Sequence, residues 1–315
     1  MTTEIILIIS ILCSLIATRV LIPILKKMKI GQPIREEGNK EHYAKAGTPT
    51  MGGLAFALVF IVLTLIYTGF NFDSLIILLS TILYGAIGFI DDYAKIKKNE
   101  NLGLTERQKL ILQIFFAFVI VLISYIGKNN LGYLIVPFFN ININFGIFVI
   151  PVLMFVFVGT TNAVNLTDGI DGLLASVSIP VFFGVFLIAN TTFANISTTA
   201  LIFAGVLIGY LAFNSNPASV FMGDTGSMAI GGSVTAMMML MNLTLFIAIL
   251  GGIYMAEALS VMLQVASVKL RGKRIFLMSP FHHHYELKGH KEPKIVANFM
   301  IVSILLTALT VYLVG

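Results

Sequence analysis

DSLIILLSTILYGAIGFIDDY, residues 73–93, is an apolar run of membrane-spanning length that ends on two carboxylates, Asp91 and Asp92. Such a run predicts a helix that crosses a bilayer. Comparable runs recur along the chain, and the predicted spans are 3–25, 51–69, 73–90, 108–127, 147–163, 172–189, 199–213, 225–241, 243–268 and 296–314. Hydrophobic residues make up 57% of the sequence, and the mean hydropathy is +0.95. The sequence therefore predicts an all-α integral membrane protein of about ten transmembrane helices.

The polar stretches between these spans are too short to form a soluble domain, so residues 1–315 are expected to be a single polytopic membrane domain. Loops 26–50, 91–109 and 269–295 hold 18 of the 20 Lys and Arg residues. By the positive-inside rule these loops are cytoplasmic, and both termini then lie outside. The segment 128–146 alternates Asn and Ile, which predicts a short external hairpin.

Acidic residues gather at the ends of the spans. Asp168, Asp171 and Asp224 join Asp91 and Asp92, in a chain of which only 11% is charged. The parity of the spans places all five at the cytoplasmic edge, and ionisable groups near a membrane are seldom retained without a function. Oxygen ligands with no cysteine cluster indicate Mg²⁺ and a phosphate-bearing substrate.

Most of these acidic residues also have a purely structural interpretation. Asp91 and Asp92 could be a solvated helix end, although adjacent carboxylates also suit a metal ligand beside a general base. Asp224, taken alone, suits a helix N-cap, and Thr167 or Asp168 could cap the following helix. For the segment 162–172 a polar ligand site is favoured, because one helix cap does not need two amides and two carboxylates within ten residues.

Other polar residues on the same predicted face complete the candidate site. His282, His283 and His284 stand together in a loop, where imidazoles can hold phosphate or sugar oxygens and shuttle protons. Lys45 is a candidate phosphate or uracil contact, and Phe221 offers a ring for a base to stack on. Glu257 lies inside the ninth predicted span, and nothing local decides its role.

Read together, five stretches resemble the bacterial phospho-N-acetylmuramoyl-pentapeptide transferases, the MraY translocase family of the polyprenyl-phosphate N-acetylhexosamine-1-phosphate transferase superfamily. The stretches are Gly47–Gly53, Gly88–Tyr93, Asn162–Gly172, Asn214–Ser227 and Pro280–Gly289, and they occur in the family's order. The triple His followed by Glu-Leu-Lys-Gly is typical of this branch. The sequence departs from the family pattern at Glu37-Gly-Asn39, His290 and Asn298, which affects loop packing more than the carboxylate set.

The resemblance implies a Mg²⁺-dependent transfer of phospho-MurNAc-pentapeptide from UDP-MurNAc-pentapeptide to undecaprenyl phosphate, with release of UMP and formation of lipid I. It implies a multi-pass protein of the bacterial plasma membrane, acting at its cytoplasmic face. The expected partners are the two substrates and the lipid bilayer, with a homodimer left open and no nucleic acid. The expected catalytic residues are Asp91, Asp92, Asp224 and His283, and the expected metal ligands are Asp224, Asp91 and Asp168. The expected substrate-binding residues are Lys45, Thr50, Lys95, Lys109, Asn162, Asn165, Asp168, Asp171, Asn214, Phe221, Gly223, Gln264, His282 and His284.

Two other functions stay open at this point. The sister activity would move GlcNAc-1-phosphate onto the same lipid. A cation or proton transporter would also keep carboxylates in the membrane, but transporters usually hold them near the midplane in repeated halves, and no repeat is visible here. The sequence does not decide between a one-step and a two-step mechanism, or which of Asp91 and Asp92 is the base.

Overall fold

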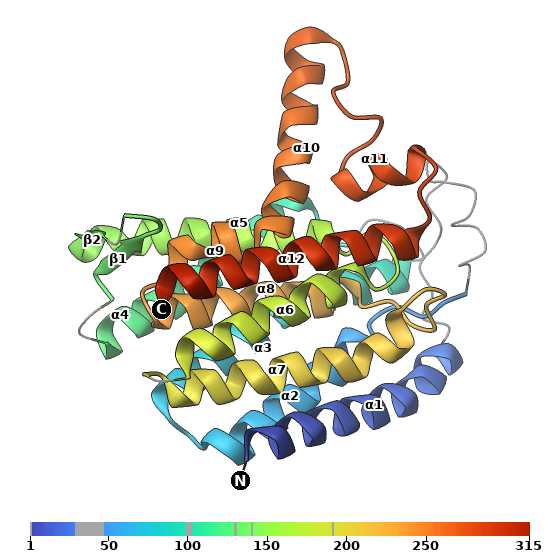
Figure 1. The fold of residues 1–315 in the computed structure, drawn as a ribbon. Helices are drawn as coiled ribbons and strands as arrows, with labels where there is room; N and C mark the ends of the chain where they lie inside the picture. The colour runs from blue at the N-terminus through green and yellow to red at the C-terminus, as the bar shows by residue number, and fades with distance from the viewer. Residues whose placement is uncertain (1, 29–46, 99–102, 129–130, 140, 191) are drawn as a thin grey trace.

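The computed structural model describes residues 2–28, 47–98, 103–128, 131–139, 141–190 and 192–315, and it is a bundle of long helices (Figure 1). The long helices are α1 (Thr3–Lys27), α2 (Gly53–Thr68), α3 (Phe72–Lys98), α4 (Glu106–Gly127), α5 (Val149–Thr167), α6 (Leu173–Ala189), α7 (Ala194–Asn214), α8 (Gly223–Leu240), α10 (Gly252–Arg271) and α12 (Glu292–Val314). The short elements are the strands β1 (Tyr133–Val136) and β2 (Ile141–Asn144), the helices α9 (Ile247–Leu250) and α11 (Phe281–Leu287), and the 3₁₀ turns η2 (Gly146–Phe148) and η3 (Thr244–Phe246).

The all-α membrane fold is confirmed. Within the described residues, seven helices are long and apolar enough to cross a membrane, and α2 and α6 are shorter apolar helices. The count of ten spans is therefore not confirmed. The predicted hairpin is confirmed, because β1 pairs antiparallel with β2 and Tyr133 lies opposite Asn144. Figure 1 shows this hairpin and the C-terminus at one end of the bundle, with α11 toward the other end.

The prediction of one continuous ninth helix over 243–268 is wrong. The chain forms η3 and then α9, stops at Gly251, and starts again as α10. Gly251 and Gly252 follow each other there, and glycine is the least favourable helix residue after proline because its backbone loses the most freedom. After this break α10 projects from the bundle (Figure 1).

Helix α8 lies at the centre of the bundle and is buried along almost its whole length. Its Gly, Ala and Ser residues let neighbouring backbones come close, which is the usual basis of helix packing in membranes. The Ser80 hydroxyl of α3 donates to the Gly232 carbonyl of α8 at 2.8 Å, and the Thr81 and Ser233 hydroxyls lie 2.7 Å apart. These polar contacts fix the register of α3 against α8.

Helix α3 packs directly against the backbone of α8 at Gly88, just before the two carboxylates. A Cβ atom on Gly88 would lie 2.1 Å from the Asp224 carbonyl oxygen. Only glycine therefore lets the end of α3 lie directly against the start of α8. This contact brings Asp91 and Asp92 to Asp224.

We expect Gly88→Ala to push α3 away from α8, because backbone atoms of α8 cannot yield as a flexible side chain would. Overpacking of this kind costs about 1–3 kcal/mol. The purified variant should therefore melt at a lower temperature in detergent and lose activity as its carboxylates separate.

Gly159→Ala on α5 is the matched control, because a Cβ there meets no atom within 4 Å. Alanine is the better helix former by about 1 kcal/mol, so this variant should melt at the wild-type temperature or above it. Equal melting temperatures for the two variants would contradict the proposed close contact at Gly88.

Candidate active site

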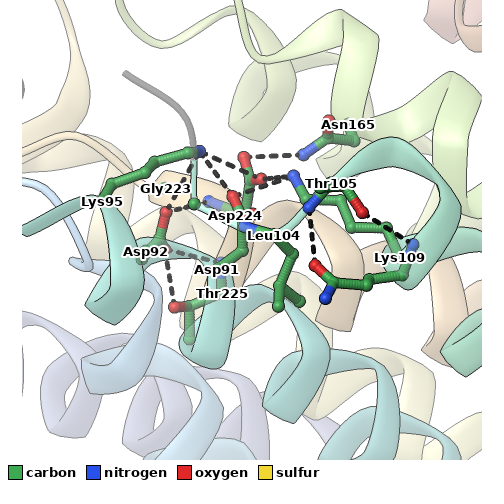
Figure 2. A network of polar contacts seen from close by, with 12 residues as sticks. Asp91, Asp92, Lys95, Leu104, Thr105, Lys109, Asn165, Gly223, Asp224 and Thr225 are labelled. Carbon is green, nitrogen blue, oxygen red and sulfur yellow. Dashed lines mark hydrogen bonds and ion pairs between the residues drawn. The ribbon is translucent and has the colours of Figure 1, made fainter. Parts of the chain in front are cut away.

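Three carboxylates meet where α3 ends and α8 begins (Figure 2). Asp91 and Asp92 come from the last turns of α3, and Asp224 comes from the first turn of α8. One oxygen of each lies within 4.8 Å of the others. Asp91 and Asp92 are fully buried, whereas the Asp224 side chain is 16% exposed. Three negative charges this close require positive charge nearby.

Two lysines supply that charge. The Lys95 ammonium lies 2.7 Å from Asp91 Oδ2 and 3.2 Å from Asp224 Oδ2. The Lys109 ammonium, on α4, lies 2.8 Å from the same Asp91 oxygen and 2.6 Å from the same Asp224 oxygen. Both lysines therefore bridge Asp91 and Asp224 (Figure 2). The space between these two carboxylates accommodates cationic groups.

Asp92 has a different environment from Asp91. Its Oδ1 accepts from the Asp224 backbone N–H at 3.2 Å, and its Oδ2 accepts from the N–H and the hydroxyl of Thr225 at 2.9 and 2.8 Å. Asp92 therefore accepts from N–H groups at the start of α8 that have no partner within their own helix. The alternative that Asp224 is the N-cap is wrong, because Met222 holds the N-cap position and Asp224 lies within the first turn of α8.

Asp91 fixes the start of α4. Its Oδ1 accepts from the Leu104 backbone N–H at 2.7 Å, just before the α4 capping box of Thr105 and Gln108. This box pairs the Thr105 hydroxyl with the Gln108 N–H and the Gln108 side chain with the Thr105 N–H. The start of α4 is thereby defined, and Lys109 follows one turn later.

Asn165 reaches the cluster from α5. Its amide donates to Asp224 Oδ1 at 3.0 Å and to the Ser227 hydroxyl at 2.8 Å. Asp224 is therefore held from three sides, by α3, α4 and α5. The structure brings together six of the residues that the sequence singled out, Asp91, Asp92, Lys95, Lys109, Asn165 and Asp224.

The turn between α5 and α6 carries Asp168, which lies outside the group of three carboxylates. Burial, followed by the carboxylates of Asp224, Asp92 and Asp171, raises the pKa of Asp168 to about 8. The surroundings thus disfavour a further negative charge and favour a cationic or hydrogen-bond-donating ligand. The prediction that Thr167 or Asp168 caps α6 is wrong, because the N-cap is Gly172 with a left-handed backbone and no side-chain cap.

Asp171 is buried and bonded within the protein. Its Oδ2 accepts from the Ala218 N–H at 3.0 Å and from the Asn216 amide at 3.3 Å. The Asn216 amide also donates to Glu292 Oε2 at 3.1 Å, and the Asp171 N–H donates to the same oxygen at 3.3 Å. Asp171 therefore ties the α5–α6 turn to the segment that precedes α8.

The three histidines lie in different surroundings. His282 is fully buried, and its Nδ1 lies 3.2 Å from Glu257 Oε2. His283 is partly exposed and pairs with Glu286. His284 Nδ1 accepts from the Leu277 N–H at 3.1 Å, and partial desolvation, then Lys288, lowers its pKa, which favours the neutral acceptor form.

Several other expected substrate contacts make internal bonds. Asn162 exchanges amide hydrogen bonds with Gln113 of α4 at 2.8 and 3.3 Å. The Asn214 amide donates to the Val220 carbonyl at 3.0 Å. Gln264 accepts from the Ile275 and Phe276 N–H groups and donates to the Phe276 carbonyl, so it holds the chain that leaves α10.

The remaining expected contacts lie close to the carboxylates or outside the described structure. A Cβ on Gly223 would meet Asp92 Oδ2 at 2.6 Å and the Thr50 hydroxyl at 2.9 Å. Gly223 and Thr50 therefore both adjoin the cluster. Phe221 is partly exposed, and its backbone pairs with Pro49 and Gly52. Lys45 lies outside the described residues.

Sequence reasoning missed Gln113, Asn216, Thr225, Ser227 and Glu292. Thr225 and Ser227 stand in the quoted 214–227 stretch, and their hydroxyls beside Asp224 were the available signal. The sequence could also have indicated Gln113, because it lies one turn beyond Lys109 on the same face of α4. Glu292 had no local signal, since its partners come from distant segments.

Comparison with known proteins identifies the class of protein. A family model described as glycosyl transferase family 4 matches residues 74–242, and a phospho-N-acetylmuramoyl-pentapeptide-transferase signature matches residues 45–56. The fold and the site thus define a membrane-embedded glycosyl transferase.

Close relatives narrow this class. A phospho-N-acetylmuramoyl-pentapeptide-transferase of Halalkalibacterium halodurans is 44% identical over 98% of this chain and 96% of its own. Enzymes of the same description from Clostridium novyi and Caldanaerobacter subterraneus are 47% and 46% identical, over 93% and 95% of this chain and 91% and 94% of theirs. The chain belongs to the phospho-N-acetylmuramoyl-pentapeptide-transferase family.

Proposed function

We propose that this chain transfers phospho-MurNAc-pentapeptide from UDP-MurNAc-pentapeptide to undecaprenyl phosphate, forming lipid I and releasing UMP. Family membership supports this activity. The observation that carries it in the structure is the cluster of Asp91, Asp92 and Asp224 with two lysines at the end of a membrane helix. A lipid phosphate at the headgroup level and a soluble nucleotide can meet only at such an edge.

The reaction exchanges one phosphorus–oxygen bond for another. An oxygen of the lipid phosphate attacks the phosphorus that carries MurNAc, and the bond from that phosphorus to the UMP oxygen breaks. Such chemistry depends mostly on positioning and on neutralising negative charge. Lys95 and Lys109 are suited to hold diphosphate oxygens, because each already lies against Asp91 and Asp224.

Mg²⁺ is the proposed cofactor, with Asp224 and Asp91 as its ligands. The residues present fit a hard cation, because the oxygens of the three carboxylates lie within 4.8 Å and two ammonium groups already lie between Asp91 and Asp224. A bound Mg²⁺ would supply additional neutralisation of the diphosphate charge. Asp168 remains a third proposed ligand on the neighbouring turn.

Asp91 is the better candidate to orient or deprotonate the lipid phosphate. Both oxygens of Asp92 accept from the start of α8, whereas Asp91 uses only Oδ1 for a backbone N–H, that of Leu104, and its Oδ2 lies against the Lys95 and Lys109 ammonium groups. Ion pairs with flexible ammonium groups can be exchanged for a substrate more easily than backbone bonds that hold a helix. Asp92 then acts by placing Asp224.

The donor is proposed to extend from the carboxylates toward the α5–α6 turn. Asn165 and His283 would lie near the diphosphate and sugar, and Asp168, Phe221 and Lys45 toward the uridine. The partial exposure of His283 and the environment of Asp168 support these placements.

The site is proposed to face the cytoplasm, with both termini outside, because 18 of 20 basic residues lie in the loops on its side. In a Cys13→Ser background, Lys98→Cys and Lys288→Cys should resist an impermeant thiol reagent added to intact cells. Asn142→Cys in the exposed hairpin should react. The opposite labelling pattern would place the site outside the cell and would contradict the proposal that a nucleotide is the donor.

A donor assay tests the function directly. With undecaprenyl phosphate and Mg²⁺, the purified chain should release UMP from UDP-MurNAc-pentapeptide and not from UDP-GlcNAc. EDTA should abolish the release, and Mg²⁺ or Mn²⁺ should restore it while Zn²⁺ does not, because the ligands are hard oxygens.

Two results would overturn the assignment. Turnover of UDP-GlcNAc alone would identify the sister activity. Absence of UMP release with either donor, together with cation flux into proteoliposomes, would identify a transporter.

We expect Asp224→Asn to fold with an unchanged melting temperature and to lose most of kcat, by about a factor of 10² or more. The fold survives because Asp92, not Asp224, caps α8. Activity is lost because the amide carries no charge for the cation. Steady-state UMP release over a Mg²⁺ titration measures this.

Asp92→Ala is the contrasting variant. Loss of a helix cap costs about 0.5–2 kcal/mol, so this variant should melt at a lower temperature. Near-native UMP release by a folded Asp224→Asn enzyme at ordinary Mg²⁺ would show that the metal is held elsewhere.

A further inference from the structure

Glu257 is a buried carboxylate that the proposed reaction does not use. It lies on α10, an apolar helix, and its side chain is fully buried. Burying an ionisable group in such a helix is unfavourable unless hydrogen-bond partners compensate for it, so its partners indicate its role. Glu257 lies outside the group formed by Asp91, Asp92 and Asp224.

The partners of Glu257 come from the start of α11. Its Oε2 accepts from the Phe281 N–H at 2.6 Å, and its Oε1 accepts from the His282 N–H at 3.2 Å. The Nδ1 atom of the His282 ring lies 3.2 Å from Oε2. One carboxylate thus receives the first backbone N–H groups of α11 and also faces the imidazole, which favours the tautomer with the proton on Nδ1.

The far side of the His282 ring lies against the α5–α6 turn. A Cβ on Gly169 would lie 2.0 Å from His282 Nε2, so the imidazole packs directly on the Gly169 backbone. Gly169 follows Asp168, which we place on the donor side. A continuous buried connection therefore runs from Glu257 on α10, through His282, to the turn that carries Asp168.

We propose that Glu257 is a positioning residue for the donor site, and this inference rests on the proposed function. Its carboxylate holds α11 and the His282 ring against Gly169, so that His283 and Asp168 face the donor in one fixed arrangement. The Phe281 and His282 N–H groups donate to different oxygens of Glu257, and the His282 Nδ1 atom lies beside Oε2, so the carboxylate uses both of its oxygens. Glutamine has only one acceptor oxygen, and its NH₂ group would face another donor.

Glu257→Gln is therefore the decisive variant in the purified full chain. Lost charge-assisted hydrogen bonds predict a rise of about tenfold to a hundredfold in KM for UDP-MurNAc-pentapeptide, with kcat changed less than KM. Nitrogen-15 spectra of the labelled histidines should lose the Nδ1-protonated signal, assigned to His282 by its absence in His282→Asn. Ser260→Ala, on the same buried face of α10, should keep the wild-type KM and spectrum.

Gly169→Ala presses on the same ring from the opposite side and leaves the carboxylate unchanged. It should raise the donor KM in the same way, and it provides the test if Glu257→Gln does not fold. A wild-type KM in folded Glu257→Gln or in Gly169→Ala, or an unchanged His282 spectrum in folded Glu257→Gln, would overturn the proposal. The histidine spectrum can be measured without turnover, so it tests the role of Glu257 by itself. Absence of UMP release from the wild-type chain would overturn the proposed function instead.

Discussion

The contact between the Asp92 carboxylate and the start of α8 is the interaction on which the site depends. It places a negative charge at the positive end of a helix, where it is favourable, and it joins two helices that are far apart in sequence. The contact is sterically possible because Gly88 has no side chain at the crossing and Gly223 has none beside Asp92. Without it, Asp224 would not face Asp91, and the two lysines would have no shared partner.

Charge balance then organises the rest of the site. Helix α3 contributes carboxylates together with Lys95, and α4 contributes Lys109, whose position follows from the bond between Asp91 and Leu104. The acidic cluster is therefore compensated by ammonium groups that are partly exposed, and not by backbone alone. Such groups can move to a phosphate ligand at low cost, because their long side chains have many rotamers. A site for diphosphate chemistry needs this kind of exchangeable compensation.

The sequence was sufficient for the features that depend on composition and order. Apolar length predicted the membrane helices, and alternating Asn and Ile predicted the hairpin. The ends of the spans predicted that the acidic residues share one face, and the family resemblance implied that Asp91 and Asp224 belong to one site. It could not separate Asp92 from Asp91, because adjacent residues in one motif differ only in the partners that α4 and α8 bring. It could not show that Gln264 bonds to the segment that follows α10, because that contact depends on how the chain turns back after α10 ends.

The buried and partly buried carboxylates around this site have two kinds of partner. Asp92, Asp171 and Glu257 accept from backbone N–H groups of another segment and are buried. Asp224 instead faces ammonium and amide side chains and is partly exposed. Asp91 has both kinds of partner, because its Oδ1 accepts from the Leu104 N–H while its Oδ2 lies against the Lys95 and Lys109 ammonium groups. Exchanging a backbone donor for a substrate would release a helix or a turn, whereas exchanging an ammonium group releases only a side chain. The partner of each carboxylate, more than its place in a motif, therefore indicates whether it shapes the site or takes part in the chemistry.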